Sequence, residues 1–184
     1  MSSATLATDT KTTWEIDPTH SVVEFSVKHM MISRSKGTFS AFSGSILLDD
    51  LRFEDSTVEL DIDAASIDTR DEKRDEHLRA ADFFNVEQFP VMRFVSTAVH
   101  LIDEERFTLD GQLSIAGTTR PIEIAAKRTG SGINPWGMQV IGFEGDATVN
   151  RKDFNLNWNM ALEAGGFLVG DDVTIHFDIE AIRQ

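Results

Sequence analysis

The stretch VTIHFDIE, Val173–Glu180, alternates apolar and polar side chains without a break. The apolar residues would all point to one face of an extended chain, and they are Val173, Ile175, Phe177 and Ile179. A period of two is the pattern of a β-strand with one buried face and one exposed face. We therefore predict a half-buried strand at this position.

The same alternation recurs along most of the chain. It is regular over residues 23–28, 58–63, 107–115 and 119–128, and less regular over 37–49, 91–102 and 138–150. Turn-forming pairs such as Asp49-Asp50 and Gly170-Asp171 separate these stretches. About eight strands with polar outer faces favour a closed sheet, because open edges aggregate. We predict an all-β, eight-stranded antiparallel barrel, which side chains alone can fill or which can hold one small ligand.

One charged stretch interrupts the strand pattern, RDEKRDEHLRAADFF at Arg70–Phe84. Thr69 and Glu72 have the spacing of a capping box, which predicts a short helical segment over about 70–84. Asp75 and Arg79 are spaced as an i,i+4 ion pair within it.

Three interpretations of this helix stay open. It can be a solvated surface helix, or a metal site that uses His77 with Glu76 or Asp75, although no HExxH-like spacing is present. It can also be a lid whose Phe83 and Phe84 close one end of a hollow barrel.

Composition excludes several classes of protein. The net charge of −14 repels nucleic acid and anionic lipid headgroups, and no cysteine is present for a disulfide or a thiolate site. No run of about 18 apolar residues predicts membrane insertion. The N-terminal residues lack the apolar core of a secretory signal, which favours a cytoplasmic protein. We expect a flexible tail at 1–12 and a single barrel domain at 13–184.

Four segments together resemble the YceI-like family in order and spacing. They are WEIDPTHSVVEFSVKHMMISRSKGTFSAFSGSI, SIDTRDEKRDEHLRAADFFNVEQFPVMRFVST, LSIAGTTRPIEI and GDDVTIHFDIEAI. The resemblance implies a lipocalin-like barrel with an elongated apolar cavity for a polyisoprenoid or similar long amphiphile. Two features depart from the family: many relatives carry a secretory signal and work in the periplasm, and Asn155 stands where the family usually has glycine. Asn tolerates positive φ, so we expect that turn to survive.

Candidate ligand-binding residues come from the inward strand faces. They are Phe25, Val27, Leu60, Ile62, Phe94, Leu109, Leu113, Ile124, Phe143, Ile175 and Phe177, with Phe83 at the rim and Met30 at the mouth. Such a wall suits an isoprenoid, quinone or fatty-chain molecule.

Catalysis is not predicted, and neither is a metal or cofactor. The five histidines have no nucleophile or carboxylate partners at motif spacing, and we expect His100 and His176 to face solvent. His29 and His77 match the family pattern, so we expect them, with Arg74 and Asp75, to hold loop to helix by hydrogen bonds. An enzyme that uses His29 or His77 as general base on a bound lipid is the alternative. A purely structural domain with a filled barrel is the third hypothesis, and a homodimer is possible.

Overall fold

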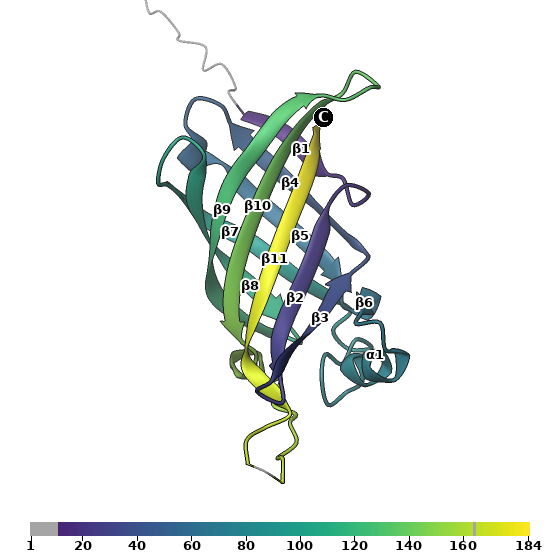
Figure 1. The fold of residues 1–184 in the computed structure, drawn as a ribbon. Coiled ribbons are helices and arrows are strands. Elements are labelled where there is room, and N and C mark those ends of the chain that lie inside the picture. The colour runs from purple at the N-terminus through teal and green to yellow at the C-terminus, as the bar shows by residue number, and fades with distance from the viewer. Residues whose placement is uncertain (1–10, 164) are drawn as a thin grey trace, which may run out of the picture.

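The computed structural model describes residues 11–163 and 165–184, which form an antiparallel sheet and one α-helix (Figure 1). The strands are β1 Lys11–Ile16, β2 Val22–His29, β3 Ser33–Phe39, β4 Phe42–Asp49, β5 Thr57–Asp63, β6 Ile67–Asp68, β7 Val91–Leu101, β8 Arg106–Ile115, β9 Thr118–Ile133, β10 Gln139–Asn150 and β11 Val169–Arg183. The helix is α1 Glu72–Arg79, and the 3-10 turns are η1 Phe53–Asp55, η2 Ala64–Ser66 and η3 Arg151–Phe154. Most of the expected tail, residues 1–10, lies outside the described residues, whereas Lys11 and Thr12 belong to β1. The division at residue 13 stays a prediction.

Eight strands form a closed antiparallel ring in the order β1, β4, β5, β7, β8, β9, β10, β11 and back to β1. The closing contact pairs Trp14 with Arg183 and Ile16 with Ala181. The remaining strands lengthen the ring at one end, because β2 pairs with β11 beyond β1, β3 pairs with β2, and β6 pairs with β3. The predicted eight-stranded, lipocalin-like barrel is therefore confirmed.

The chain leaves the sheet between β1 and β2, while β11 continues unbroken past the gap. The Asp17 amide donates to the Glu180 carbonyl at 2.8 Å, and the Ser21 hydroxyl accepts from the Glu180 amide at 2.9 Å. These bonds replace the ladder bonds that a continuous strand would make, so the Glu180 backbone stays paired.

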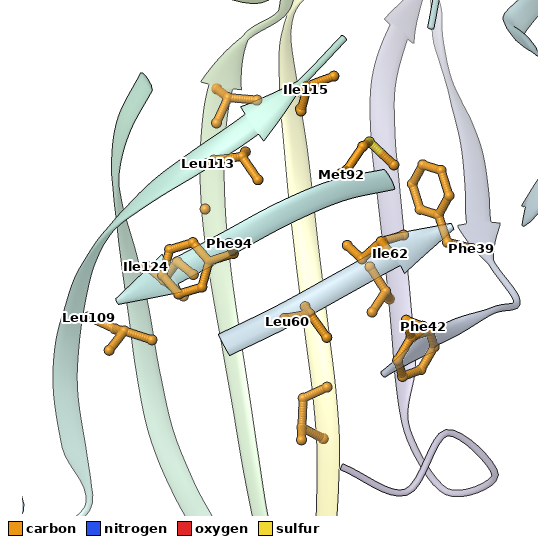
Figure 2. Packing of buried hydrophobic residues seen from close by; sticks show 14 of the residues in the cluster. Phe39, Phe42, Leu60, Ile62, Met92, Phe94, Leu109, Leu113, Ile115 and Ile124 are labelled. Carbon is orange, nitrogen blue, oxygen red and sulfur yellow. The ribbon is translucent and has the colours of Figure 1, made fainter. Parts of the chain in front are cut away.

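The core follows the alternation that the sequence predicts. In β8 the inward residues are all buried, and they are Phe107, Leu109, Leu113 and Ile115. Figure 2 shows Leu109, Leu113 and Ile115 on this strand. Gly111 lies between them, where a Cβ atom would overlap the ring of Phe94 on the neighbouring strand. Glycine is needed here because the ring lies directly against the β8 backbone.

The helix is shorter than predicted, and it begins at a different residue. Its N-cap is Asp71, whose carboxylate accepts from the Arg74 amide at 3.2 Å. Thr69 does not cap the helix, because its amide and hydroxyl both donate to the buried Asp75 carboxylate. The predicted ion pair of Asp75 with Arg79 is also wrong, since Arg79 donates to backbone carbonyls instead.

After Arg79 the chain turns out of the helix and reaches Pro90 through irregular turns. Among residues 11–163 and 165–184, no helix has both the length and the apolar composition that crossing a bilayer would require.

Candidate ligand cavity

Residues of β2, β3 and α1, among others, line a cavity of about 440 Å³, which we term the main cavity. These three elements lie at the lower end of the barrel in Figure 1. Seven of the predicted wall residues line the main cavity, and they are Phe25, Val27, Ile62, Phe83, Leu113, Ile175 and Phe177. Several of them are only half-buried although they point inward, because they border open space instead of packing against other side chains. The barrel is therefore hollow at this end.

A second space of about 90 Å³, called here the minor cavity, lies in the other half of the barrel. Five more predicted wall residues line it, and they are Leu60, Phe94, Leu109, Ile124 and Phe143. Phe177 lines both cavities. The single elongated cavity that the family resemblance implies is thus divided, because bulky side chains fill the middle of the barrel.

Met30 lines neither cavity. It lies just after β2 in the turn that leads to β3, is 40% exposed, and has a positive φ of 52°. Its amide donates to the Leu168 carbonyl at 2.8 Å, which joins this turn to the loop before β11. Met30 therefore lies on the outer rim and not in the cavity wall.

Polar side chains that the alternation pattern does not predict in the wall also line the main cavity. They are Lys28, His29, Ser35, Thr69, Asp71, Lys73, Arg74, His77 and Arg151. Alternation assigns such residues to the solvent face, and it cannot show that residues of α1 line the cavity. The charged run at Arg70–Arg79 was the only sequence signal for this polar mouth.

Arg151 is the most buried of these cations, with 3% of its surface exposed. Its guanidinium donates to the carbonyls of Gly170 at 2.8 Å and Trp158 at 2.9 Å, and also to that of Leu156. Burial lowers the pKa of Arg151, and the nearby Asp171 carboxylate opposes that shift. Arg151 therefore fastens the segment after η3 to β11, where this segment forms part of the cavity wall.

The helix is attached to the barrel end through Thr69. Arg74 donates to the Thr69 hydroxyl and carbonyl, both at 2.7 Å, and the Thr69 amide donates to Asp75 at 3.0 Å. The predicted hydrogen-bonding roles of Arg74 and Asp75 are confirmed.

His77 bonds to Asp82 at 2.8 Å and packs edge-on against Trp158, with 4.7 Å between ring centroids. Because Asp75 and His77 are already engaged with different partners, the arrangement does not support the metal site considered for this helix. Phe83 and Phe84 both line the main cavity, as the lid interpretation requires.

The other histidines occupy different environments. On the outer face of the barrel, His100 forms a hydrogen bond with Asp110 of the neighbouring strand at 3.1 Å. His176 forms one with Asp146 of its own neighbouring strand at 2.8 Å. Sequence spacing missed these partners because they come from adjacent strands. His29 lines the main cavity, but within the described part of the chain its imidazole makes no hydrogen bond, so its expected bond from loop to helix is not observed.

Asp17, His20 and Glu180 form a polar cluster, and their ligand-type atoms lie within 4.8 Å of one another. The hydrogen bond from His20, and then the one from the Thr19 amide, lowers the pKa of Asp17. The hydrogen bond to Asp17 and its negative charge raise the pKa of His20. None of the three lines either cavity, so we treat the cluster as an ion pair that holds the β1–β2 turn.

A closed antiparallel barrel with an apolar cavity at one end defines a lipocalin-like fold. The family model described as the YceI-like domain matches residues 14–181. The chain belongs to the YceI-like family.

Curated relatives are similar over most of their length. A UPF0312 protein of Azotobacter vinelandii is 35% identical over 165 residues, covering 90% of this chain and 83% of the relative. A UPF0312 protein of Ectopseudomonas mendocina is 36% identical over the same shares.

Solved structures share the fold. BcnA of Burkholderia cenocepacia matches with a TM-score of 0.79 at 23% identity, over 90% of this chain and 98% of that one. The YCEI protein of Campylobacter jejuni matches with a TM-score of 0.72 at 30% identity, over 85% and 90%. A polyisoprenoid binding domain from Saccharophagus degradans matches with a TM-score of 0.69 at 15% identity, over 93% and 98%.

Proposed function

We propose that this protein binds a polyisoprenoid or a similar long-chain amphiphile in the main cavity, for storage or transport and without catalysis. The main cavity carries the proposal, because its volume of about 440 Å³ is within the range of small-molecule sites and its deep wall is built from Phe, Ile, Val and Leu side chains. The description of the Saccharophagus degradans domain as polyisoprenoid binding supports the same ligand class.

Burial of a hydrocarbon chain supplies enough free energy by itself. Each buried methylene contributes about 0.8 kcal/mol, so a dozen exceed the ~8 kcal/mol of micromolar binding before the costs of association. The deep wall therefore needs no hydrogen-bonding group. The polar head of an amphiphile would lie at the mouth, where Lys28, Lys73 and Arg74 are found.

Exposed apolar residues beside the mouth support exchange of the ligand with lipid assemblies. Met31 and Ile32 in the β2–β3 turn are 66% and 85% exposed, and Met160 and Phe167 in the loop before β11 are 56% and 58% exposed. The Met30 amide and the Leu168 carbonyl join these two loops into one apolar tip, which we define as Met31, Ile32, Met160 and Phe167. An apolar surface of this kind is typical of a contact site for lipid or protein.

The alternatives differ in what they require. A purely structural domain needs a filled barrel, and a main cavity of about 440 Å³ disfavours it. The enzyme alternative has one supporting observation, because His29 and His77 both line the main cavity. For that alternative, replacing one of these histidines with Ala would abolish turnover of the bound lipid and leave its retention unchanged.

Extraction of the protein purified from its native host, followed by mass spectrometry, tests the proposal. We expect a prenyl or other long-chain lipid in near-stoichiometric amount. Ile175→Trp should displace it, because Ile175 lines the main cavity and the larger ring takes up ligand space. Asp178→Trp is the matched control, since it places the same ring on the exposed face of the same strand.

An empty extract from the unaltered protein would contradict the proposal, and so would equal lipid content in both variants. The cytoplasmic location and the possible homodimer stay predictions, which cell fractionation and sedimentation measurements test.

A further inference from the structure

We propose that Phe177 divides the barrel interior and sets how far a hydrocarbon chain can reach into it. Phe177 borders both the main cavity of about 440 Å³ and the minor cavity of about 90 Å³. Among the described residues, no other side chain borders both spaces. The ring therefore lies at the boundary between the two cavities.

The inward residues of β11 place this boundary along the barrel axis. Val173 and Ile175 line the main cavity, Phe177 lines both cavities, and Ile179 lines the minor cavity. The same order holds on two other strands. On β5, Ile62 lines the main cavity and the next inward residue, Leu60, lines the minor cavity. On β7, Met92 lines the main cavity and Phe94 lines the minor cavity. The two spaces are therefore consecutive along one barrel, and a layer of side chains separates them.

On the opposite side of the barrel, the aromatic ring of Phe94 is closely packed. In the ring of eight strands, β7 is four positions from β11, so inward side chains of β7 face those of β11 across the barrel. Phe94 on β7 is 3% exposed, and its ring lies against the backbone of Gly111. Figure 2 shows Phe94 beside Ile124 in the packed interior. Phe177 is only partly buried, because it has open space on two sides. Of the two rings, Phe177 is thus the one whose removal would join the cavities.

This inference rests on the proposed function, because the depth of the interior matters only for a chain-like ligand. With Phe177 present, carbons beyond the length of the main cavity must stay at the mouth in water, and they add no affinity. With a small side chain at this position, the same carbons can enter the minor cavity. Phe177 is therefore a specificity-determining residue for chain length.

Calorimetric titration of the delipidated protein tests this role with two series of increasing length, straight-chain alcohols and prenyl alcohols. For the unaltered protein, affinity should rise with length and then reach a plateau. In Phe177→Ala the plateau should begin at a longer chain in both series, with affinity rising about fourfold for each additional buried methylene. Phe177→Leu should show a smaller shift in the same direction, and it keeps the test available if the Ala variant does not fold.

Phe25→Ala is the matched control. It removes the same kind of ring, but Phe25 lines only the main cavity. The chain length at which affinity stops rising should therefore stay too short to reach the minor cavity. An unchanged plateau in both Phe177 variants would overturn the dividing role and leave lipid binding intact. Equal shifts in Phe25→Ala and Phe177→Ala would also overturn it.

The two proposals fail in different ways. If straight-chain alcohols bind and show the Phe177 shift while prenyl alcohols do not bind, the polyisoprenoid part of the proposed function is wrong, and the dividing role stands. If the unaltered protein binds neither series, both proposals are overturned.

Discussion

Gly111 shows how one residue without a side chain positions an aromatic ring inside the barrel. A Cβ atom at this position would overlap the ring of Phe94 and approach the Val95 carbonyl. Gly111→Ala should therefore lower the free energy of unfolding by about 1–3 kcal/mol, which is the usual cost of overpacking a core. Urea denaturation measures the change.

Gly130→Ala is the control for this prediction. Apart from Gly130 itself and its two chain neighbours, no described residue has an atom within 4 Å of the Cβ position at Gly130, and its φ is not in the left-handed region. We expect an unchanged or slightly higher free energy of unfolding, because alanine restricts the unfolded chain. Equal destabilisation by the two substitutions would contradict the account of Gly111.

The pair of Asp17 and His20 makes the β1–β2 turn sensitive to pH. The hydrogen bond with Asp17 raises the pKa of His20 above its ordinary 6.5, so this contribution to stability is complete below pH 6.5 and is lost as pH rises through the folded-state value. The hydrogen bond with His20 lowers the pKa of Asp17 below 3.8, so its contribution is present above pH 3.8 and is lost as pH falls through the folded-state value. The pair should therefore stabilise the turn most between about pH 3.8 and 6.5.

NMR titration of the His20 ring measures this shift directly. Asp17→Asn should return the pKa of His20 toward its ordinary value, although Glu180 at 3.9 Å keeps part of the attraction. A His20 titration that is the same in both proteins would show that Asp17 is not the cause.

At the scale of elements, the buried Asp75 carboxylate joins α1 to the segment that precedes it. It accepts from the Thr69 amide at 3.0 Å and also from the Thr69 hydroxyl. Asp75→Asn removes the negative charge and can place the Asn amide NH2 opposite the donors of Thr69. We therefore expect the free energy of unfolding to fall by about 1–3 kcal/mol. Hydrogen exchange should become faster in residues 72–79 and stay unchanged in β8.

Glu76→Gln provides the comparison, because Glu76 is an exposed neighbour on the same helix. This variant should leave exchange in α1 unaltered. Slower exchange in Asp75→Asn than in the unaltered protein would be the opposite of our expectation.

At the scale of the whole molecule, the apolar tip and the main cavity lie at the same end of the barrel. Met31→Asn combined with Ile32→Asn should slow transfer of a fluorescent prenyl lipid from vesicles severalfold and leave equilibrium retention unchanged. Asn suits this turn because Met31 has a φ of 62°, which Asn tolerates. Stopped-flow fluorescence measures the rate.

Leu51→Asn is the control at the opposite end of the molecule. Leu51 is 77% exposed and follows β4, whose residues Ile46 and Leu48 line the minor cavity. Its substitution should not change the transfer rate. Equal slowing by both substitutions would indicate that the rate depends on total apolar surface and not on the tip.

The strands and their inward faces could be predicted from the sequence without the structure. The alternation at Val173–Glu180 and across Gly111 predicts both, because a period of two depends only on local backbone geometry. The turn at Asn155 was expected for another reason, because the family usually has glycine there and Asn tolerates a positive φ; its φ is 61°. Twelve of the thirteen candidate wall residues line one of the two cavities, and Met30 does not.

The position of the hollow part of the interior, and the side chains that bound it, could not be predicted without the folded structure. The division at Phe177, the choice of Asp71 over Thr69 as N-cap, and the polar mouth around Arg74 and Arg151 all depend on contacts between distant segments. Alternation states which side of a strand faces inward, but the free volume inside a barrel depends on how side chains from opposite strands meet. The contacts between these side chains depend on ring closure and on the register between strands, and no single stretch of sequence specifies either.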